Sequence, residues 1–222
     1  MEAASVFDVV VNPDRFFSRR LTYVDAVVPI LLAAIVGIGL SYAYRPFFVE
    51  ALLASLPGDV PPAALDSVVS KALRFGGVGA AMTPIVQVGV TATLVFVMLA
   101  ACGDTLPRFE SLCVCAAWAA LLLLGKDLAR YGMLLSGGLE SIGQITDLQP
   151  GVGLGFLIAE PRSVAHDALE AINGFDIGYV VVLAFAIGRS ERVRFRDALG
   201  AATTAWLLLQ AVRIGFGALF YR

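Results

Sequence analysis

Five apolar stretches run through this chain, and each approaches the length that a helix needs to cross a lipid bilayer. A hydrocarbon core of about 30 Å takes about 20 helical residues. The stretches cover approximately residues 26–44, 78–102, 112–131, 168–188 and 198–221. The fourth is continuously apolar only from Phe175 to Gly188, so we expect its helix to begin upstream, near Ala168. The sequence therefore predicts an all-α integral membrane protein with a bundle of five transmembrane helices.

Composition supports a membrane protein and excludes several other classes. Apolar residues make up 59% of the 222 residues and charged residues only 15%, whereas a globular domain is about one quarter charged. The formal net charge of −2 gives no basis for nucleic-acid binding, which needs clustered Lys and Arg. We expect one polytopic membrane domain over residues 1–222, in contact with the lipid bilayer and with other membrane proteins or further copies of itself.

Arginine is denser on one side of the predicted spans. Three short segments on the side of the N-terminus carry Arg15, Arg19, Arg20, Arg108, Arg189, Arg192, Arg194 and Arg196. The basic residues of the opposite side, Arg45, Lys71, Arg74, Lys126, Arg130 and Arg162, are spread over two longer loops, with Arg222 at the terminus. Because cytoplasmic loops are enriched in Lys and Arg, we expect residues 1–24 in the cytoplasm and the C-terminus outside. Glu2 and Asp8 precede the first apolar stretch, so we expect no secretory signal.

A unit of surface helix, span, Arg-Phe turn and span appears twice, over residues 62–131 and 161–221. Arg108-Phe109 lies between the second and third spans, and Arg194-Phe195 lies between the fourth and fifth. Each hairpin follows a candidate amphipathic helix, at residues 62–75 and 161–172, that opens with proline and is followed by glycine. Such helices lie on the membrane surface or pack against their own spans. Internal duplication and chance recurrence of Arg-Phe in arginine-rich turns are both open interpretations.

Charged residues fall within the predicted spans. Lys126, Asp127 and Arg130 lie on the third span, Asp176 at the outer end of the fourth and Arg213 on the fifth. Lys126 is about 21 Å along its helix from Leu112, so it has not clearly left the hydrocarbon. Unpaired charges at such depth are costly and face a partner or a water-filled cavity. We expect Asp127 as the first candidate partner of Arg213 and Asp176 as the second. A polar pocket or ion path and a structural ion pair with snorkelling cations are the two interpretations.

The side chains that usually hold metals or perform catalysis are sparse. Cys102, Cys113 and Cys115 match no zinc spacing, and the single histidine, His166, is predicted on the opposite face. No P-loop, Gly-x-Ser-x-Gly or His-Glu-x-x-His motif occurs. The glycine-rich residues 152–155 lack the lysine of a phosphate cradle and are expected to form a flexible loop. We expect no catalytic residue, no metal, no cofactor and no enzymatic activity.

The N-terminal segment combines aromatic residues with arginines before the first span. Asn12-Pro13 is followed by Phe16-Phe17 and Arg19-Arg20, a pattern that suits the interface of an anionic leaflet or a simple turn before a helix. Together with the five spans and the Phe109 and Phe195 turns, this segment resembles the Yip domain family of Ypt/Rab-interacting membrane proteins, in its prokaryotic branch. The resemblance covers essentially the whole chain.

The resemblance implies a scaffold or adaptor in a bacterial or archaeal plasma membrane. Eukaryotic members recruit small GTPases, but their long acidic N-terminal extension is absent here, which argues against GTPase binding. We expect a non-enzymatic scaffold whose cytoplasmic contact surface consists of Asn12, Pro13, Phe16, Phe17, Arg108, Phe109, Arg194 and Phe195. The alternative is a small ion or solute transporter or channel that uses the intramembrane charges. Whether residues 137–160 re-enter the membrane is left open.

Overall fold

The computed structural model describes residues 9, 11–55, 61–102, 106–143, 145–148, 150–158 and 163–220, and the elements within them are helical. The α-helices are α2 (Pro13–Ser18), α3 (Val24–Ala43), α4 (Arg45–Ser55), α5 (Pro62–Cys102), α6 (Phe109–Gly137), α7 (Val164–Glu170), α8 (Gly174–Ser190) and α9 (Phe195–Phe220). Three short 3₁₀ helices, η1 (Leu139–Ser141), η2 (Ile145–Leu148) and η3 (Leu154–Leu157), lie between α6 and α7.

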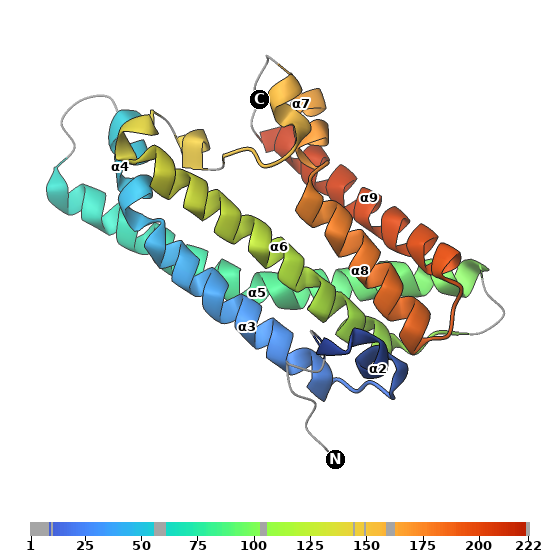
Figure 1. The fold of residues 1–222 in the computed structure, drawn as a ribbon. Coiled ribbons are helices and arrows are strands. Elements are labelled where there is room, and N and C mark those ends of the chain that lie inside the picture. Colours follow the sequence, from blue (N-terminus) through green and yellow to red (C-terminus); the bar gives the residue numbers. More distant parts are fainter. Residues whose placement is uncertain are drawn as a thin grey trace.

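Four of the described helices, α3, α5, α6 and α9, are long and apolar enough to cross a membrane. A fifth span results if α7 and α8 are counted together, although they are bent by 56° at the break between them. Figure 1 shows α3, α6, α8 and α9 side by side, with α2 at one end of the bundle and α4 and α7 at the other. We call these the α2 end and the far end. The predicted all-helical chain is confirmed among the described residues, and four of the five predicted spans, or all five if the bent pair is counted as one, are long and apolar enough to cross a membrane.

Helix α6 lies at the centre of this bundle, in contact with α3, α5 and α8. Each of its residues from Ser111 to Ala120 is buried, and most are Ala, Cys or Ser. Small side chains let neighbouring helices approach closely in a membrane, where packing rather than water exclusion holds helices together. Cys113 and Cys115 are among these buried residues.

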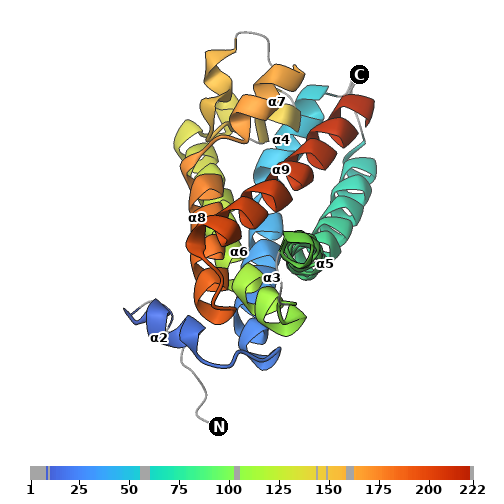
Figure 2. The ribbon, with the colours of Figure 1, turned by 90° about the vertical axis from the view of Figure 1, so that its right-hand side faces the viewer.

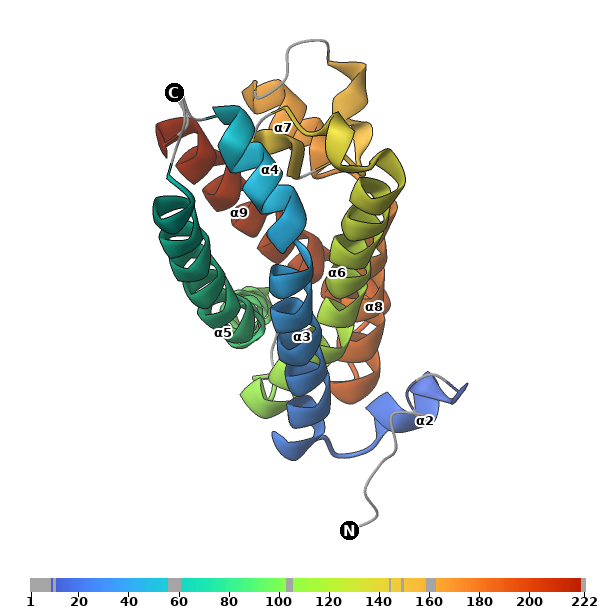
Figure 3. The same ribbon diagram turned by 90° about the vertical axis from the view of Figure 1, so that its left-hand side faces the viewer.

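The first predicted surface helix is not a separate element. Residues 62–75 continue through Gly76 and Gly77 into one 41-residue helix, α5, so the predicted break before the second span is wrong. Glycine lowers helix stability by only about 1 kcal/mol per residue, and Gly77 lies next to Ser41 of α3. The direction of α5 changes further along, where Pro84 lies inside the helix, and Figures 2 and 3 show its two halves running differently.

The fourth span begins later than predicted. A continuous helix from Ala168 is wrong, because α7 ends at Glu170 and α8 starts afresh at Gly174. Asn173 has an extended backbone and caps α8, its side chain accepting a hydrogen bond of 2.9 Å from the Asp176 amide. Residue 161, the predicted start of the preceding amphipathic helix, lies outside the described residues.

One helix was not predicted. Residues 45–55, expected in a loop, form α4, which starts directly after Tyr44 and packs against η2 and α5 at the far end. Phe47 and Ala51 of this helix are buried with Leu134 and Ile142 in a small second core. Helix α4 therefore closes the far end of the bundle beside α6.

Candidate functional site

Asp176 is the centre of a buried polar cluster. Its carboxylate forms an ion pair with Lys126 Nζ at 2.7 Å, and the two side chains are 2% and 8% exposed. The same carboxylate accepts hydrogen bonds from Asn173 Nδ2, from Trp206 Nε1 at 3.2 Å and from Gln210 Nε2 at 3.3 Å. Four donors therefore saturate the two oxygens, and the cluster joins α6, α8 and α9.

A second ion pair lies at the far end, beside the first. Arg130 Nη2 of α6 is 3.4 Å from Glu170 Oε1 at the end of α7. The amides of Val152 and Gly153 donate to the two oxygens of Glu170, at 2.6 and 3.0 Å. The glycine-rich segment is thus an anion cradle, but its anion is a side chain of the same protein.

Close packing explains the glycine at position 153. A Cβ atom there would lie 2.2 Å from the main-chain oxygen of Glu170, a contact that no side chain tolerates. The segment 150–158 therefore packs against α7 through η3. The expected free, flexible loop is wrong for these residues.

The predicted pairing of Arg213 is also wrong. Arg213 is exposed on α9 and forms no ion pair with any residue that the structure describes. Its two candidate partners are arranged differently, because Asp176 pairs with Lys126 and Asp127 lines a pocket between α3, α5 and α6. Of the five predicted intramembrane charges, the structure brings Lys126 and Asp176 together and places Arg130 beside them with Glu170.

Asp127 differs from its charged neighbours. It is exposed, accepts no hydrogen bond and joins no ion pair within the described part of the chain. It lines a pocket of about 410 Å³ between α3, α5 and α6. Asp127 lies about 15 Å before the end of α6 at Gly137, within a helix long and apolar enough to span the membrane.

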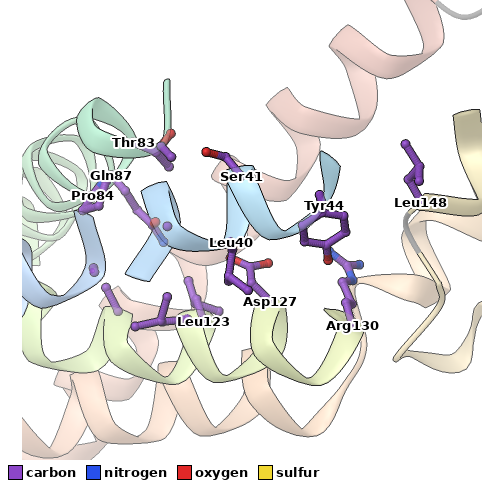
Figure 4. Close-up of a pocket in the computed structure, with 15 residues that line it drawn as sticks. Leu40, Ser41, Tyr44, Thr83, Pro84, Gln87, Leu123, Asp127, Arg130 and Leu148 are labelled. Carbon is purple, nitrogen blue, oxygen red and sulfur yellow. The ribbon is translucent and has the colours of Figure 1, made fainter. Parts of the chain in front are cut away.

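The walls of this pocket are apolar with a few polar groups. Figure 4 shows Asp127 and Arg130 on α6, facing Leu40 and Tyr44 at the end of α3, while Ser41 points towards Thr83 of α5 and Gln87 reaches in from α5. The described residues that line it are Ala33, Gly37, Leu40, Ser41, Tyr44, Ala80, Thr83, Pro84, Gln87, Ala120, Leu123, Leu124, Asp127, Arg130 and Leu148. Apolar walls with a small number of placed polar groups are typical of small-molecule sites.

The predicted contact surface at the α2 end is only partly exposed. Phe16 and Phe17 are 3% and 2% exposed, so their assignment to a free contact surface is wrong. Phe16 packs edge-on against Trp118 of α6, and Phe17 packs against Phe185 of α8. Asn12 and Pro13 serve the helix start, because the Asn12 side chain accepts a hydrogen bond of 3.2 Å from the Arg15 amide.

The remaining residues of that surface are accessible. Phe109 and Phe195 are 38% and 50% exposed, and Arg194 is exposed beside them. Arg108 is engaged instead, since its guanidinium is 3.3 Å from Glu191 and its amide also donates to Glu191, at 2.9 Å. The two Arg-Phe turns therefore meet at the α2 end through Arg108 and Glu191.

Several residues of these sites were missed by sequence reasoning. Asn173 carried a usable signal, because an Asn three residues before an acidic residue is a typical helix start. The sequence carried no comparable signal for Glu170, Trp206 and Gln210, since their roles depend on which helices are neighbours. His166 lies 3.4 Å from Asp167, and no group of three or more metal-binding side chains occurs among the described residues.

No family model matches the chain, and no curated protein and no solved structure shows significant similarity to it. The class of protein follows from the fold, which is a helical bundle with four or five candidate membrane spans.

Proposed function

We propose that this protein is a small non-enzymatic membrane transporter that binds its solute in the pocket between α3, α5 and α6. The observation that carries this proposal is Asp127, a carboxylate without a partner among the described residues, on the wall of a pocket inside a candidate span. Lys126, Arg130, Glu170 and Asp176 are engaged with one another, so they serve the architecture. Unpaired intramembrane charges are rare and mark substrate or ion pathways.

One interruption of a helix at the pocket supports transport rather than static packing. Pro84, which lines the pocket, lies inside α5, and the two halves of this helix run in different directions. Discontinuous helices near the middle of the membrane surround the substrate sites of many secondary transporters. Proline in a helix also removes one hydrogen bond and allows a change of direction.

The test uses a variant that fills the pocket. Protein in lipid nanodiscs is equilibrated with a panel of neutral, cationic and anionic small molecules, washed and analysed by mass spectrometry; retained compounds are then followed into proteoliposomes. Thr83→Phe should abolish retention and uptake, because Thr83 lines the pocket. Thr93→Phe is the matched control, since Thr93 is also exposed on α5 and donates to the carbonyl four residues earlier, at the same 2.8 Å. Equal retention by both variants, or none by the unmodified protein, would contradict the proposal.

A Yip-type scaffold is the second candidate, and the exposed Phe109 and Phe195 at the α2 end support it. Native mass spectrometry of the unmodified protein should then show a reproducible, stoichiometric partner. The Phe195→Asp variant should not retain this partner. Phe75→Asp is the control, because Phe75 is 78% exposed on the opposite, N-terminal half of α5. Equal partner capture by both variants would count against the contact surface.

A further inference from the structure

We infer that the solute of this pocket is a small organic ammonium ion, a monocation with an apolar body; this rests on the proposed pocket function. The first argument is the balance of charge around the second half of α6. Lys126 and Arg130 are two cations, whereas Asp127, Glu170 and Asp176 are three carboxylates, which leaves a net charge of −1. The negative charge without a partner is the one on the pocket wall.

Two hydroxyl groups of the pocket can only accept hydrogen bonds from a ligand, whereas Gln87 and Tyr44 can also donate. The Ser41 and Thr83 hydroxyls donate their protons to the Ile38 and Gly79 carbonyls, at 2.7 and 2.8 Å, so towards a ligand they can only accept. Pro84 has no N–H to offer the carbonyl of Ala80, which also lines the pocket. Acceptor oxygens in a pocket that also holds a carboxylate suit a cation and oppose an anion.

The cation of the pocket wall does not cancel this preference. Arg130 directs its terminal nitrogen to Glu170, at 3.4 Å, and its side chain is only 16% exposed. Its buried Nε has no hydrogen-bond partner within the described residues. That single donor suits a neutral oxygen on the ligand, such as a hydroxyl group near the ammonium.

The size and the walls of the pocket favour an organic ion over a metal ion. A bare Na⁺ or K⁺ needs several oxygens converging on one point. The pocket instead offers about 410 Å³ of space, and Ala and Leu side chains form much of its wall. Tyr44 adds an aromatic ring, and aromatic rings attract quaternary ammonium groups. A protonated or quaternary amine with a hydrocarbon body matches all three features.

The probe pair is choline and its uncharged isostere 3,3-dimethylbutan-1-ol, with the full chain in nanodiscs. Choline should raise the unfolding temperature and bind saturably, and the neutral alcohol should do neither at the same concentrations. Asp127→Asn should weaken choline binding about tenfold or more, because a charge-assisted contact is lost. Asp127→Glu should retain the preference for choline, and Asp197→Asn, an exposed acid of α9, should change nothing.

The outcomes separate the ligand class from the pocket function. If the unmodified protein retains only neutral or anionic compounds, and the Thr83→Phe variant does not retain them, the ammonium assignment is overturned while the pocket function stands. Equal stabilisation by Na⁺ or K⁺ alone, or unchanged choline binding in a folded Asp127→Asn protein, would also overturn it. Absence of any retained compound would overturn both.

Discussion

At the residue scale, the Asp176 carboxylate is the point where three helices depend on one another. Lys126 comes from α6, Asp176 from α8, and Trp206 and Gln210 from α9. An ion pair with both partners buried is costly to assemble, since both charges leave water, but it is more costly to break. Its stabilising effect therefore lies in fixing which helices are neighbours.

We predict that Asp176→Asn lowers the free energy of unfolding by about 3–5 kcal/mol, because Lys126 is left as a buried charge without a counter-ion. Reversible unfolding in mixed micelles, followed by circular dichroism, measures this. The double variant Lys126→Met/Asp176→Leu should recover much of the loss. A single variant as stable as the unmodified protein would show that the pair is dispensable.

A second residue-scale prediction concerns Gly153. Gly153→Ala should displace the 150–158 segment from α7, because the new Cβ would meet the rigid backbone of Glu170. Hydrogen exchange should become faster at the Val152 and Gly153 amides, which donate to Glu170. Gly200→Ala, whose Cβ has open space, should leave exchange in this segment unchanged. Unaltered exchange in Gly153→Ala would contradict the packing described above.

At the element scale, the bend of α5 results from one proline. Pro84 lacks the N–H that would bond to Ala80, and its ring crowds the preceding turn. Close approach of α3 accompanies the bend, because Gly37 lies against Ala80, with 3.4 Å between the position of its missing Cβ and the Ala80 Cβ. The bend and the pocket are therefore parts of one arrangement.

We predict that Pro84→Ala straightens α5. Spin labels at positions 75 and 97, both exposed, should move towards the roughly 33 Å that separates residues 22 apart in a straight helix. Pulsed electron–electron double resonance measures this distance between labels on two introduced cysteines, in a protein from which the native cysteines have been removed. Ile85→Ala, an exposed neighbour, is the control. The same distance in both variants would assign the bend to packing instead of proline.

The sequence predicted that the helices exist better than it predicted where they begin and end or which helices they contact. Hydropathy predicted α3, α6 and α9 because lipid demands a continuous apolar run. The continuity of α5 through Gly76-Gly77 and the break at Asn173 depend on local capping and packing that hydropathy does not record. The partner of Lys126 was not predictable, because a span's sequence does not say which helix it faces; Asp176 was expected as a candidate partner of Arg213 instead.

At the scale of the whole molecule, the two ends differ in charge and burial. Asp14–Arg189 and Arg108–Glu191 are ion pairs at the α2 end, where Arg20 and Arg194 remain exposed. Exposed arginines near the ends of spans favour the cytoplasmic, anionic leaflet. We therefore retain a cytoplasmic α2 end as our proposal.

This orientation predicts the accessibility of two single cysteines in intact cells. Arg20→Cys should be protected from a membrane-impermeant maleimide, whereas Leu139→Cys, exposed at the far end, should be labelled. Native Cys113 and Cys115 are buried, and a cysteine-free background removes any residual reaction. The reverse labelling pattern would invert the topology without changing the fold.

The pairing of Lys126 with Asp176 also has a consequence for biogenesis. The two residues are 50 positions apart in the chain, which corresponds to about 2–10 s of synthesis on the ribosome. In the proposed membrane topology, α6 would enter the bilayer before the counter-ion of Lys126 is made, and an unpaired lysine at the centre of a span costs about 3 kcal/mol. Chains that stop before α8 would keep that exposed lysine and become natural substrates for membrane quality control.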